Sequence, residues 1–176
     1  MHPLDKFKYC PVCGSSNFNI ANEKSKECDD CGFKYYMNPS AATVAVILND
    51  RDELLVVRRK KDPARGTLDL PGGFSDMGET SEEGVIREVF EETGLKVLKT
   101  EFLFSLPNRY VYSDLLIPTM DMFFRCHVED FSNLHADDDA AECFFVSRKD
   151  LNPDEFGLMS IKKAIPIIKN IFSDLR

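Results

Sequence analysis

An acidic segment bounded by glycines, Gly73–Leu95, constrains this chain more than any other part of its sequence. Its middle predicts a helix from about Ser81 to Glu92. Thr80 or Ser81 suits the cap of the first turn, because a hydroxyl can accept a hydrogen bond from an unpaired backbone N–H. Gly94 suits the left-handed residue that ends many helices. The face expected to pack into a core carries Val85, Ile86, Val89 and Phe90.

Three carboxylates share another face of this helix. Glu88, Glu91 and Glu92 stand at positions i, i+3 and i+4, which places them side by side. Like charges at this spacing repel each other, and a hard divalent cation such as Mg²⁺ or Mn²⁺ removes the conflict. Arg87 can hold one carboxylate by a forked hydrogen bond, and a carbonyl at Gly72 can complete the ligand shell. A solvated acidic surface is the alternative.

The same residues carry a resemblance to a known family. Gly73–Leu95 reads GFSDMGETSEEGVIREVFEETGL, which resembles a complete Nudix box, G-x5-E-x7-R-E-U-x-E-E-x-G-U with U aliphatic. The resemblance implies an α/β fold, namely an α/β/α sandwich with a mixed β-sheet. It also implies a pyrophosphohydrolase that uses Mg²⁺ or Mn²⁺ to cleave the diphosphate linkage of a nucleoside diphosphate derivative.

The resemblance also assigns roles by position in the box. Glu88 and Glu92 are the expected principal ligands of Mg²⁺ or Mn²⁺. Glu91 is either a ligand or the base that takes the proton from the attacking water. Glu79 is a supporting acid at the edge of the site, and Arg87 orients the carboxylates. The chemistry needs these groups because two adjacent phosphates repel an attacking hydroxide until metal ions neutralise them.

A further acid in this family often comes from a loop outside the box. The acidic loop Asp137–Glu142 precedes a predicted strand near Cys143–Val146. Aligning Phe145 with the tryptophan that the family usually has there favours Asp139 as a metal ligand, followed by Glu142. An ordinary polar loop is the alternative.

Four of the six cysteines form two CxxC pairs, and each pair is followed by a glycine. Two such pairs supply four thiolates, which suits a tetrahedral structural Zn²⁺ without an open position. Reduced free cysteines are the alternative. The expected zinc ligands are Cys10, Cys13, Cys28 and Cys31. Cys126 and Cys143 lie in predicted strands and are expected in the core.

The sequence predicts two domains, a zinc ribbon at residues 1–38 and a Nudix hydrolase domain at residues 39–176. Zinc would stabilise the first domain, which has too few aliphatic residues to bury much of a core. A second helix is expected at Leu158–Phe172, with a kink or a break at Pro166. The other predicted strands are Ala42–Leu48, Glu53–Arg58, Thr67–Leu70, Val97–Leu106 and Met120–Val128.

A four-cysteine ribbon ahead of a Nudix domain resembles the NADH pyrophosphatases, which split NADH, and in some cases the NAD cap of RNA. Those enzymes carry S-Q-P-W-P-F-P-x-S after the box. This chain keeps Ser105 and Pro107 of that motif but has Asn108 at the tryptophan position. NADH or another NAD-like dinucleotide, ADP-ribose, other nucleotide sugars and modified nucleoside triphosphates therefore stay open as substrates.

The residues around this position form the predicted substrate-binding set. Tyr110 or Tyr112 is a candidate platform for a base, since stacking needs only an aromatic face. Arg109 is a candidate phosphate contact. Ser105 and Pro107 complete the set, and an ordinary strand is the alternative for the two tyrosines.

Charge and hydropathy limit the expected partners. The formal net charge is −8, whereas a nonspecific nucleic-acid binder is usually basic. We therefore expect a small-molecule nucleotide as the partner and nucleic acid only as a capped RNA end. No apolar run approaches the roughly 18–20 residues that cross a bilayer, and no signal-peptide core is visible. The expectations are no membrane partner, a cytoplasmic location and, by resemblance, a homodimer.

A non-catalytic module that senses a nucleotide, or binds RNA or protein, is the rival to an enzyme. Such relatives are expected to lose box glutamates or Arg87, and this chain has lost none of them.

Overall fold

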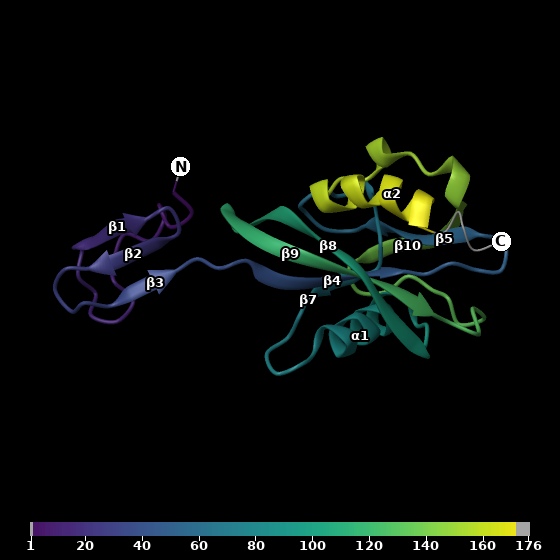
Figure 1. Cartoon of the computed structure of the whole chain (residues 1–176), viewed down its shortest axis with the longest axis horizontal. Helices are drawn as coiled ribbons and strands as arrows, with labels where there is room; N and C mark the ends of the chain where they lie inside the picture. Colours follow the sequence, from purple (N-terminus) through teal and green to yellow (C-terminus); the bar gives the residue numbers. More distant parts are fainter. Residues whose placement is uncertain (1, 172–176) are drawn as a thin grey trace.

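The computed structural model describes residues 2–171. These residues form three β-sheets and two α-helices, α1 (Ser81–Thr93) and α2 (Met159–Ile171). Figure 1 shows one small sheet at the N-terminal end of the molecule and the other two sheets between α1 and α2. The chain therefore places its larger layered part after residue 40.

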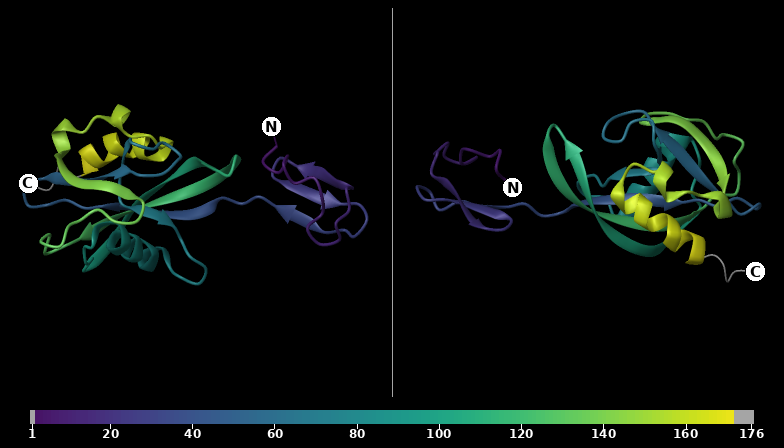
Figure 2. Two further views of the ribbon diagram at one scale, coloured as in Figure 1. Left: turned by 180° about the vertical axis from the view of Figure 1, so that it is seen from behind. Right: turned by 90° about the horizontal axis from the view of Figure 1, so that it is seen from above.

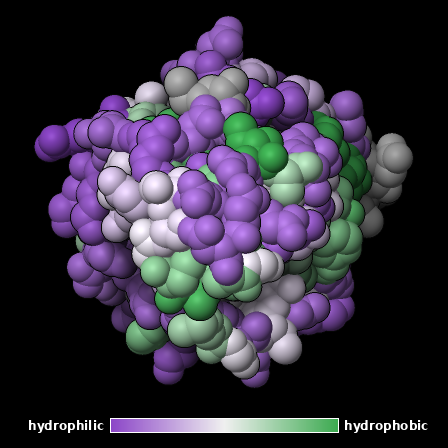
Figure 3. Space-filling view, turned by 90° about the vertical axis from the view of Figure 1, so that its left-hand side faces the viewer, coloured by the Kyte–Doolittle hydropathy of each residue, from purple (hydrophilic) through white to green (hydrophobic). Residues whose placement is uncertain are grey.

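The small N-terminal sheet is antiparallel and contains β1 (Phe18–Asn22), β2 (Ser25–Cys28) and β3 (Lys34–Tyr36). Figure 2 shows it standing apart from the layered part, joined by the segment that leads from β3 into β4. The end of the molecule seen in Figure 3 is mainly hydrophilic, with scattered apolar side chains. The apolar core of this part comprises Cys10, Phe18 and Cys28, with Phe7 and Phe33 packed against them.

The larger of the two remaining sheets has the strand order β7 (Gly72–Phe74), β4 (Ser40–Val46), β9 (Leu115–His127) and β8 (Lys99–Tyr112). β4 and β9 run parallel, while the other two pairs are antiparallel. The predicted mixed β-sheet is therefore confirmed.

The second sheet is antiparallel and has the order β10 (Ala140–Ser147), β5 (Glu53–Arg59) and β6 (Leu68–Asp69). Two short 3-10 helices, η1 (Arg148–Asp150) and η2 (Pro153–Glu155), connect β10 to α2. Residue 48 bridges to residue 54, so the hairpin between β4 and β5 links the two sheets.

Alternation along the strands divides the core into two layers. Val44 and Val46 of β4 belong to the apolar cluster that includes α2, whereas Ala45 belongs to the cluster that includes α1. Phe123 and Phe124 of β9 divide in the same way. Each helix thus covers a different face of the sheets, which confirms the predicted α/β/α sandwich (Figure 1).

The apolar face predicted for α1 is only half correct. Val85 and Val89 are fully buried, but Ile86 is 39% exposed and Phe90 is 55% exposed. The two buried valines are one helical turn apart, so a narrow stripe of α1 contacts the sheets. The wider apolar face expected from the sequence does not form.

The hairpin of β8 and β9 is longer than predicted. The sequence predicts strand ends at Leu106 and Met120, but both strands continue to a turn at Ser113 and Asp114. Both turn residues have positive φ values, 48° and 58°, which suit a two-residue hairpin turn. Pro107 lies on the edge strand β8, where a missing N–H is tolerated.

The sequence predicts a kink or a break at Pro166; α2 runs through this residue without interruption, so the break does not occur. The predicted C-terminal residue of this helix, Phe172, lies outside the described residues. Among residues 2–171, every helix is too short or too polar to cross a membrane.

Candidate active site

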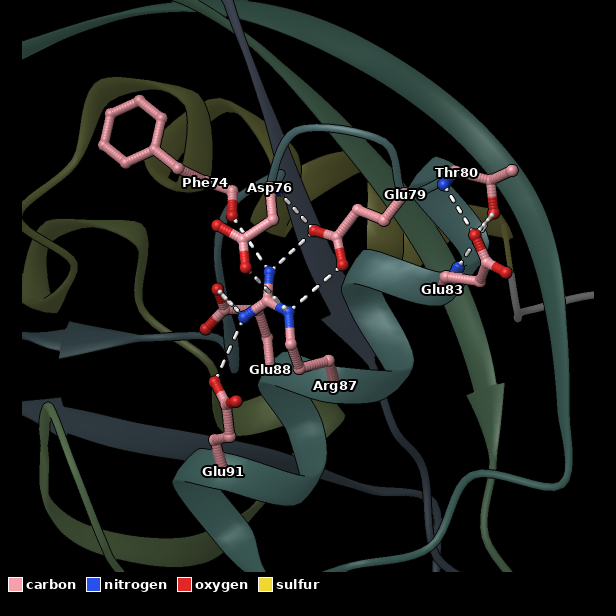
Figure 4. Close-up of polar contacts among 8 residues, drawn as sticks. All are labelled: Phe74, Asp76, Glu79, Thr80, Glu83, Arg87, Glu88 and Glu91. Carbon is pink, nitrogen blue, oxygen red and sulfur yellow. Dashed lines mark hydrogen bonds and ion pairs between the residues drawn. The ribbon is translucent and has the colours of Figure 1, made fainter.

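Both ends of α1 form as the sequence predicts, with Thr80 as the cap. The Thr80 hydroxyl accepts a hydrogen bond from the Glu83 N–H at 3.2 Å, and Glu83 Oε2 accepts one from the Thr80 N–H at 2.8 Å (Figure 4). Gly94 ends the helix in the left-handed region at φ 69°. This capping fixes where the helix begins, and therefore which way its carboxylates point.

Arg87 lies at the centre of the acidic face and contacts three glutamates (Figure 4). Its Nε and Nη2 donate to the two Glu79 oxygens at 3.1 and 2.7 Å, which is a forked pair. Its Nη1 donates to Glu88 at 2.8 Å and to Glu91 at 3.0 Å, and Nη2 also donates to the Phe74 carbonyl. The hydrogen bonds from Arg87 lower the pKa of Glu79. Arg87 thus orients the carboxylates that flank it.

Two glycines let the strand β7 lie directly against this helix. A Cβ at Gly73 would lie 2.5 Å from a Glu88 carboxylate oxygen, so only a hydrogen fits there. Gly72 has φ +152°, and a Cβ there would clash with the Thr43 carbonyl. The Gly72 N–H donates to Glu92 Oε2 at 3.1 Å. These contacts explain why the sequence has two glycines before the acidic helix.

Glu92 is a buried carboxylate without a compensating positive charge. It is 7% exposed, and no Lys, Arg or His among residues 2–171 forms an ion pair with it. Burial raises the pKa of Glu92 well above its usual range, and the negative charges of Asp69, Glu88 and Asp139 act in the same direction. Burial also raises the pKa of Glu88, against the effect of Arg87. A hard divalent cation fits this pair of oxygen donors, because it supplies the missing positive charge.

A cavity of about 390 Å³ opens beside these residues, and both sheets and both helices line it. At its α1 side lie Glu88, Glu91 and Glu92, which we call the acidic end. Glu79 does not line the cavity and stays at the edge of the site, paired with Arg87. Gly72 and Gly73 line the cavity next to the acidic end.

The acidic loop reaches the cavity only in part. Asp138 and Asp139 line it, and Asp139 forms an ion pair with Lys61. Glu142 does not line it; its carboxylate instead accepts a hydrogen bond from Arg58 at 2.9 Å. Of the two loop acids predicted as metal ligands, the structure therefore brings only Asp139 to the site.

Only one residue of the predicted substrate-binding set lines the cavity. Tyr110 does so, with its hydroxyl near Arg59 and its ring edge-on to Phe74 at 5.3 Å. From Ser105 to Val111, alternation along β8 turns the odd-numbered residues to the exposed face, and Tyr112 at the end of the strand is exposed as well. The predicted residues that do not line the cavity are Ser105, Pro107, Arg109 and Tyr112.

Several buried polar residues of the cavity were not predicted from the sequence. Asn108, Thr119 and Asp121 line it at the α2 side, and we call them the polar end. Asp69 also lines the cavity, and its carboxylate accepts a hydrogen bond from Arg59 at 2.6 Å. A sequence signal existed, since Asp69 and Asp121 are charged residues inside otherwise apolar strands.

The four N-terminal cysteines form a second cluster. Their Sγ atoms lie within 4.8 Å of one another, which suits a tetrahedral zinc ion. Gly14 and Gly32 have φ values of 76° and 72°, so each CxxC pair makes the tight turn that its glycine predicts. Within residues 2–171 no other set of three metal-binding side chains converges this closely, because Arg87 separates the carboxylates on α1.

A family model described as the NUDIX domain matches residues 37–165, which is well over half of the chain. The chain belongs to the Nudix family. The matched segment contains both helix α1 and the whole cavity lining, so the Nudix box identified in the sequence occupies its expected structural place.

Two named Nudix relatives match part of the chain. An ADP-ribose pyrophosphatase of Methanocaldococcus jannaschii is 42% identical over 79 residues, covering 44% of this chain and 46% of its own length. A NAD-capped RNA hydrolase NudC of Shigella flexneri is 33% identical over 100 residues, covering 57% of this chain and 38% of its own length. The chain thus spans less than half the length of either relative.

Solved structures support the Nudix fold. A NUDIX hydrolase from Nitrosomonas europaea has a TM-score of 0.67 at 20% identity, covering 90% of both chains. A MutT protein from Methanosarcina mazei Go1 has a TM-score of 0.62 at 20% identity, covering 80% of this chain and all of its own. At this level of identity the likeness concerns the fold alone.

Proposed function

We propose that the protein is a metal-dependent hydrolase that cleaves the diphosphate linkage of a nucleoside diphosphate derivative. ADP-ribose is the first candidate substrate, followed by NADH or another NAD-like dinucleotide, NAD-capped RNA ends and nucleotide sugars. The main support is Glu92, a buried carboxylate without a positive partner. It lies beside Glu88 at the edge of a cavity of about 390 Å³. The names of the two relatives point to the same bond type.

The roles of the residues follow from their surroundings. Glu88 and Glu92 would hold Mg²⁺ or Mn²⁺, with Asp139 and the Gly72 backbone as neighbouring oxygen donors. When bound, the metal would neutralise the phosphates and lower the pKa of a water molecule. Arg87 keeps the carboxylates apart and oriented.

The reaction needs a base, and Glu91 is the candidate. A water oxygen forms a bond to one phosphorus, and the bond from that phosphorus to the bridging oxygen breaks. Glu91 accepts the proton from the water, since it lines the cavity and is the most exposed of the three helix glutamates, at 44%.

The test is release of AMP from ADP-ribose and of mononucleotides from NADH, each with Mg²⁺ or Mn²⁺. We expect turnover by the natural sequence and a loss of at least about a hundredfold in Glu92→Gln. Glu82→Gln is the matched control, because Glu82 lies exposed on the same helix outside the site, and it should keep full activity. Binding of these nucleotides without any turnover would contradict the hydrolase and favour a sensing module.

We propose further that residues 1–38 form a zinc ribbon ahead of a Nudix domain at residues 39–176. Four reduced thiols are consistent with a cytoplasmic location, where zinc rather than disulfide formation is usual. One equivalent of zinc per chain in elemental analysis would support the ribbon, and its absence in freshly purified protein would contradict it. Light scattering on the whole chain tests the expected homodimer.

A further inference from the structure

The polar end of the cavity contains an amide that lacks a partner. Asn108 is 5% exposed, and its Oδ1 has no hydrogen-bond partner among residues 2–171. A buried amide oxygen without a partner is energetically unfavourable relative to one that accepts a hydrogen bond. Asn108 lines the cavity, so a ligand that enters the cavity can satisfy it.

Asp121 also lines the polar end and has fewer hydrogen-bond donors around it than its carboxylate can accept. It is 4% exposed, and its two oxygens accept hydrogen bonds from the hydroxyls of Thr119 and Ser160 at 2.6 and 2.5 Å. No cationic side chain among residues 2–171 pairs with it. Each carboxylate oxygen can accept a second hydrogen bond, so Asp121 has acceptor capacity left for a ligand.

Strand geometry places the two groups on one surface. Asn108 of β8 pairs directly with Thr119 of β9, and Asp121 is two residues further along β9. Residues two apart on a strand point to the same face, and all three line the cavity. The polar end therefore combines one amide and one carboxylate, a set rich in acceptors with one amide donor.

The walls beside the polar end are apolar. Val44, Leu158 and Ile161 line the cavity, and Val44 and Ile161 belong to the core layer that packs against α2. A sugar carries hydroxyls on both faces, and burying them against such walls leaves them without partners. A flat heteroaromatic base has apolar faces and polar edges, so it fits both the walls and the polar end.

We propose that the polar end reads the amino-bearing edge of an adenine base. Asp121 accepts from one N–H of the exocyclic amine, while Asn108 accepts from the other through Oδ1 and donates through Nδ2 to the neighbouring ring nitrogen. The carboxylate accepts hydrogen bonds from an amine and repels a carbonyl at the same position. An amide also matches the donor and acceptor pattern of adenine. The inference rests on the proposed function, in which the diphosphate lies at the acidic end of the same cavity.

The experiment measures binding rather than turnover. Titration calorimetry with Mg²⁺ compares non-hydrolysable α,β-methylene ADP-ribose with its inosine counterpart, which has a carbonyl in place of the amine. We expect the natural sequence to bind the adenine analogue on the order of tenfold or more tightly. Asn108→Leu and Asp121→Asn should bring this ratio close to one, with the larger change in Asp121→Asn.

The control and the folding check separate the outcomes. Val111→Thr changes an exposed residue of the same strand outside the cavity and should keep the ratio of the natural sequence. Melting curves show whether each variant is folded, and Asn108→Leu still tests the inference if Asp121→Asn does not fold. Equal binding of the two analogues by the natural sequence, or no binding of either, would overturn the inference. Absence of hydrolysis alongside a clear preference would contradict only the proposed function.

Discussion

The N-terminal sheet and the α/β/α sandwich are held together by different means. In the N-terminal part, Cys10 and Cys28 belong to the buried apolar cluster and are also candidate zinc ligands. The sandwich instead has two apolar layers built from aliphatic and aromatic side chains on both faces of its sheets. We therefore expect the first part to depend on zinc for stability and the second on apolar burial, so each should unfold under a different treatment.

The largest expected effect is on the N-terminal part. Removing zinc with a chelator, or changing Cys28→Ser, should unfold the segment around Phe18–Tyr36, because binding of a structural zinc contributes about 10–16 kcal/mol in small zinc domains. Hydrogen exchange on the whole chain would measure this, with rapid exchange in β1–β3 and unchanged protection in β4 and β9. Simultaneous loss of protection in both parts would contradict the claim that the two parts are stabilised independently.

The next effect is on the sandwich. Phe123 is fully buried, and its ring stacks on that of Phe104 with the centroids 4.7 Å apart. Phe123→Ala should lower the free energy of unfolding of the sandwich by about 3–5 kcal/mol, because it leaves a large cavity. Urea denaturation would measure the change, and zinc content serves as the control. A loss of zinc in this variant would show that the two parts are coupled.

A smaller effect of opposite sign is expected at the acidic end. With divalent metal removed, Glu92→Gln should stabilise the sandwich by about 1–3 kcal/mol at neutral pH, because a neutral amide replaces an uncompensated buried charge. Burial raises the pKa of Glu92, so the folded state binds the proton more tightly than the unfolded state. Glu92 therefore favours folding only at low pH, and this contribution is lost as the pH rises through its folded pKa.

Thermal melts of chelated protein across this pH range would measure the Glu92→Gln effect. The gain in melting temperature should grow as the pH rises from the usual carboxyl range toward neutrality. Glu82→Gln, at an exposed position of the same helix, should show no such trend. A lower melting temperature for Glu92→Gln at neutral pH would contradict the assignment of Glu92 as a destabilising buried acid.

The smallest effect is at the start of α1. Thr80→Ala removes the hydroxyl that accepts from the Glu83 N–H, and should lower the free energy of unfolding by about 1 kcal/mol. Denaturation in urea would measure this against Thr80→Ser, which keeps the hydroxyl and should be nearly neutral. A loss equal to that of Phe123→Ala would mean that α1 has a larger role in the sandwich than its two buried valines indicate.

The sequence predicted the local features that depend on neighbouring residues. The caps at Thr80 and Gly94, the acidic face of α1 and the turns after the cysteine pairs all follow from spacing of a few residues. The Nudix fold followed from the same segment, because its long pattern of fixed residues is specific. These predictions needed no knowledge of which strands are neighbours.

The features that the sequence did not predict depend on contacts between distant segments. Asn108, Asp121 and Ser160 meet only because β8 pairs with β9 and α2 packs over them. Glu142 was predicted as a metal ligand because it belongs to the acidic loop. Pairing of β10 with β5 instead places its carboxylate beside Arg58. The face on which each residue of β8 lies depends on the register of β8 with β9, which the sequence analysis did not predict.

The division of the cavity across the sheet has an evolutionary consequence. The acids proposed to act on the diphosphate lie on α1, beside the glycines of β7, while the polar end comes from β8 and β9. Proteins that carry this cavity can change the side chains at positions 108, 119 and 121 and so acquire a different nucleotide preference. Every glutamate of the helix can stay unchanged. Paralogues that share the box but differ at these three positions are therefore where new substrate preferences should be sought.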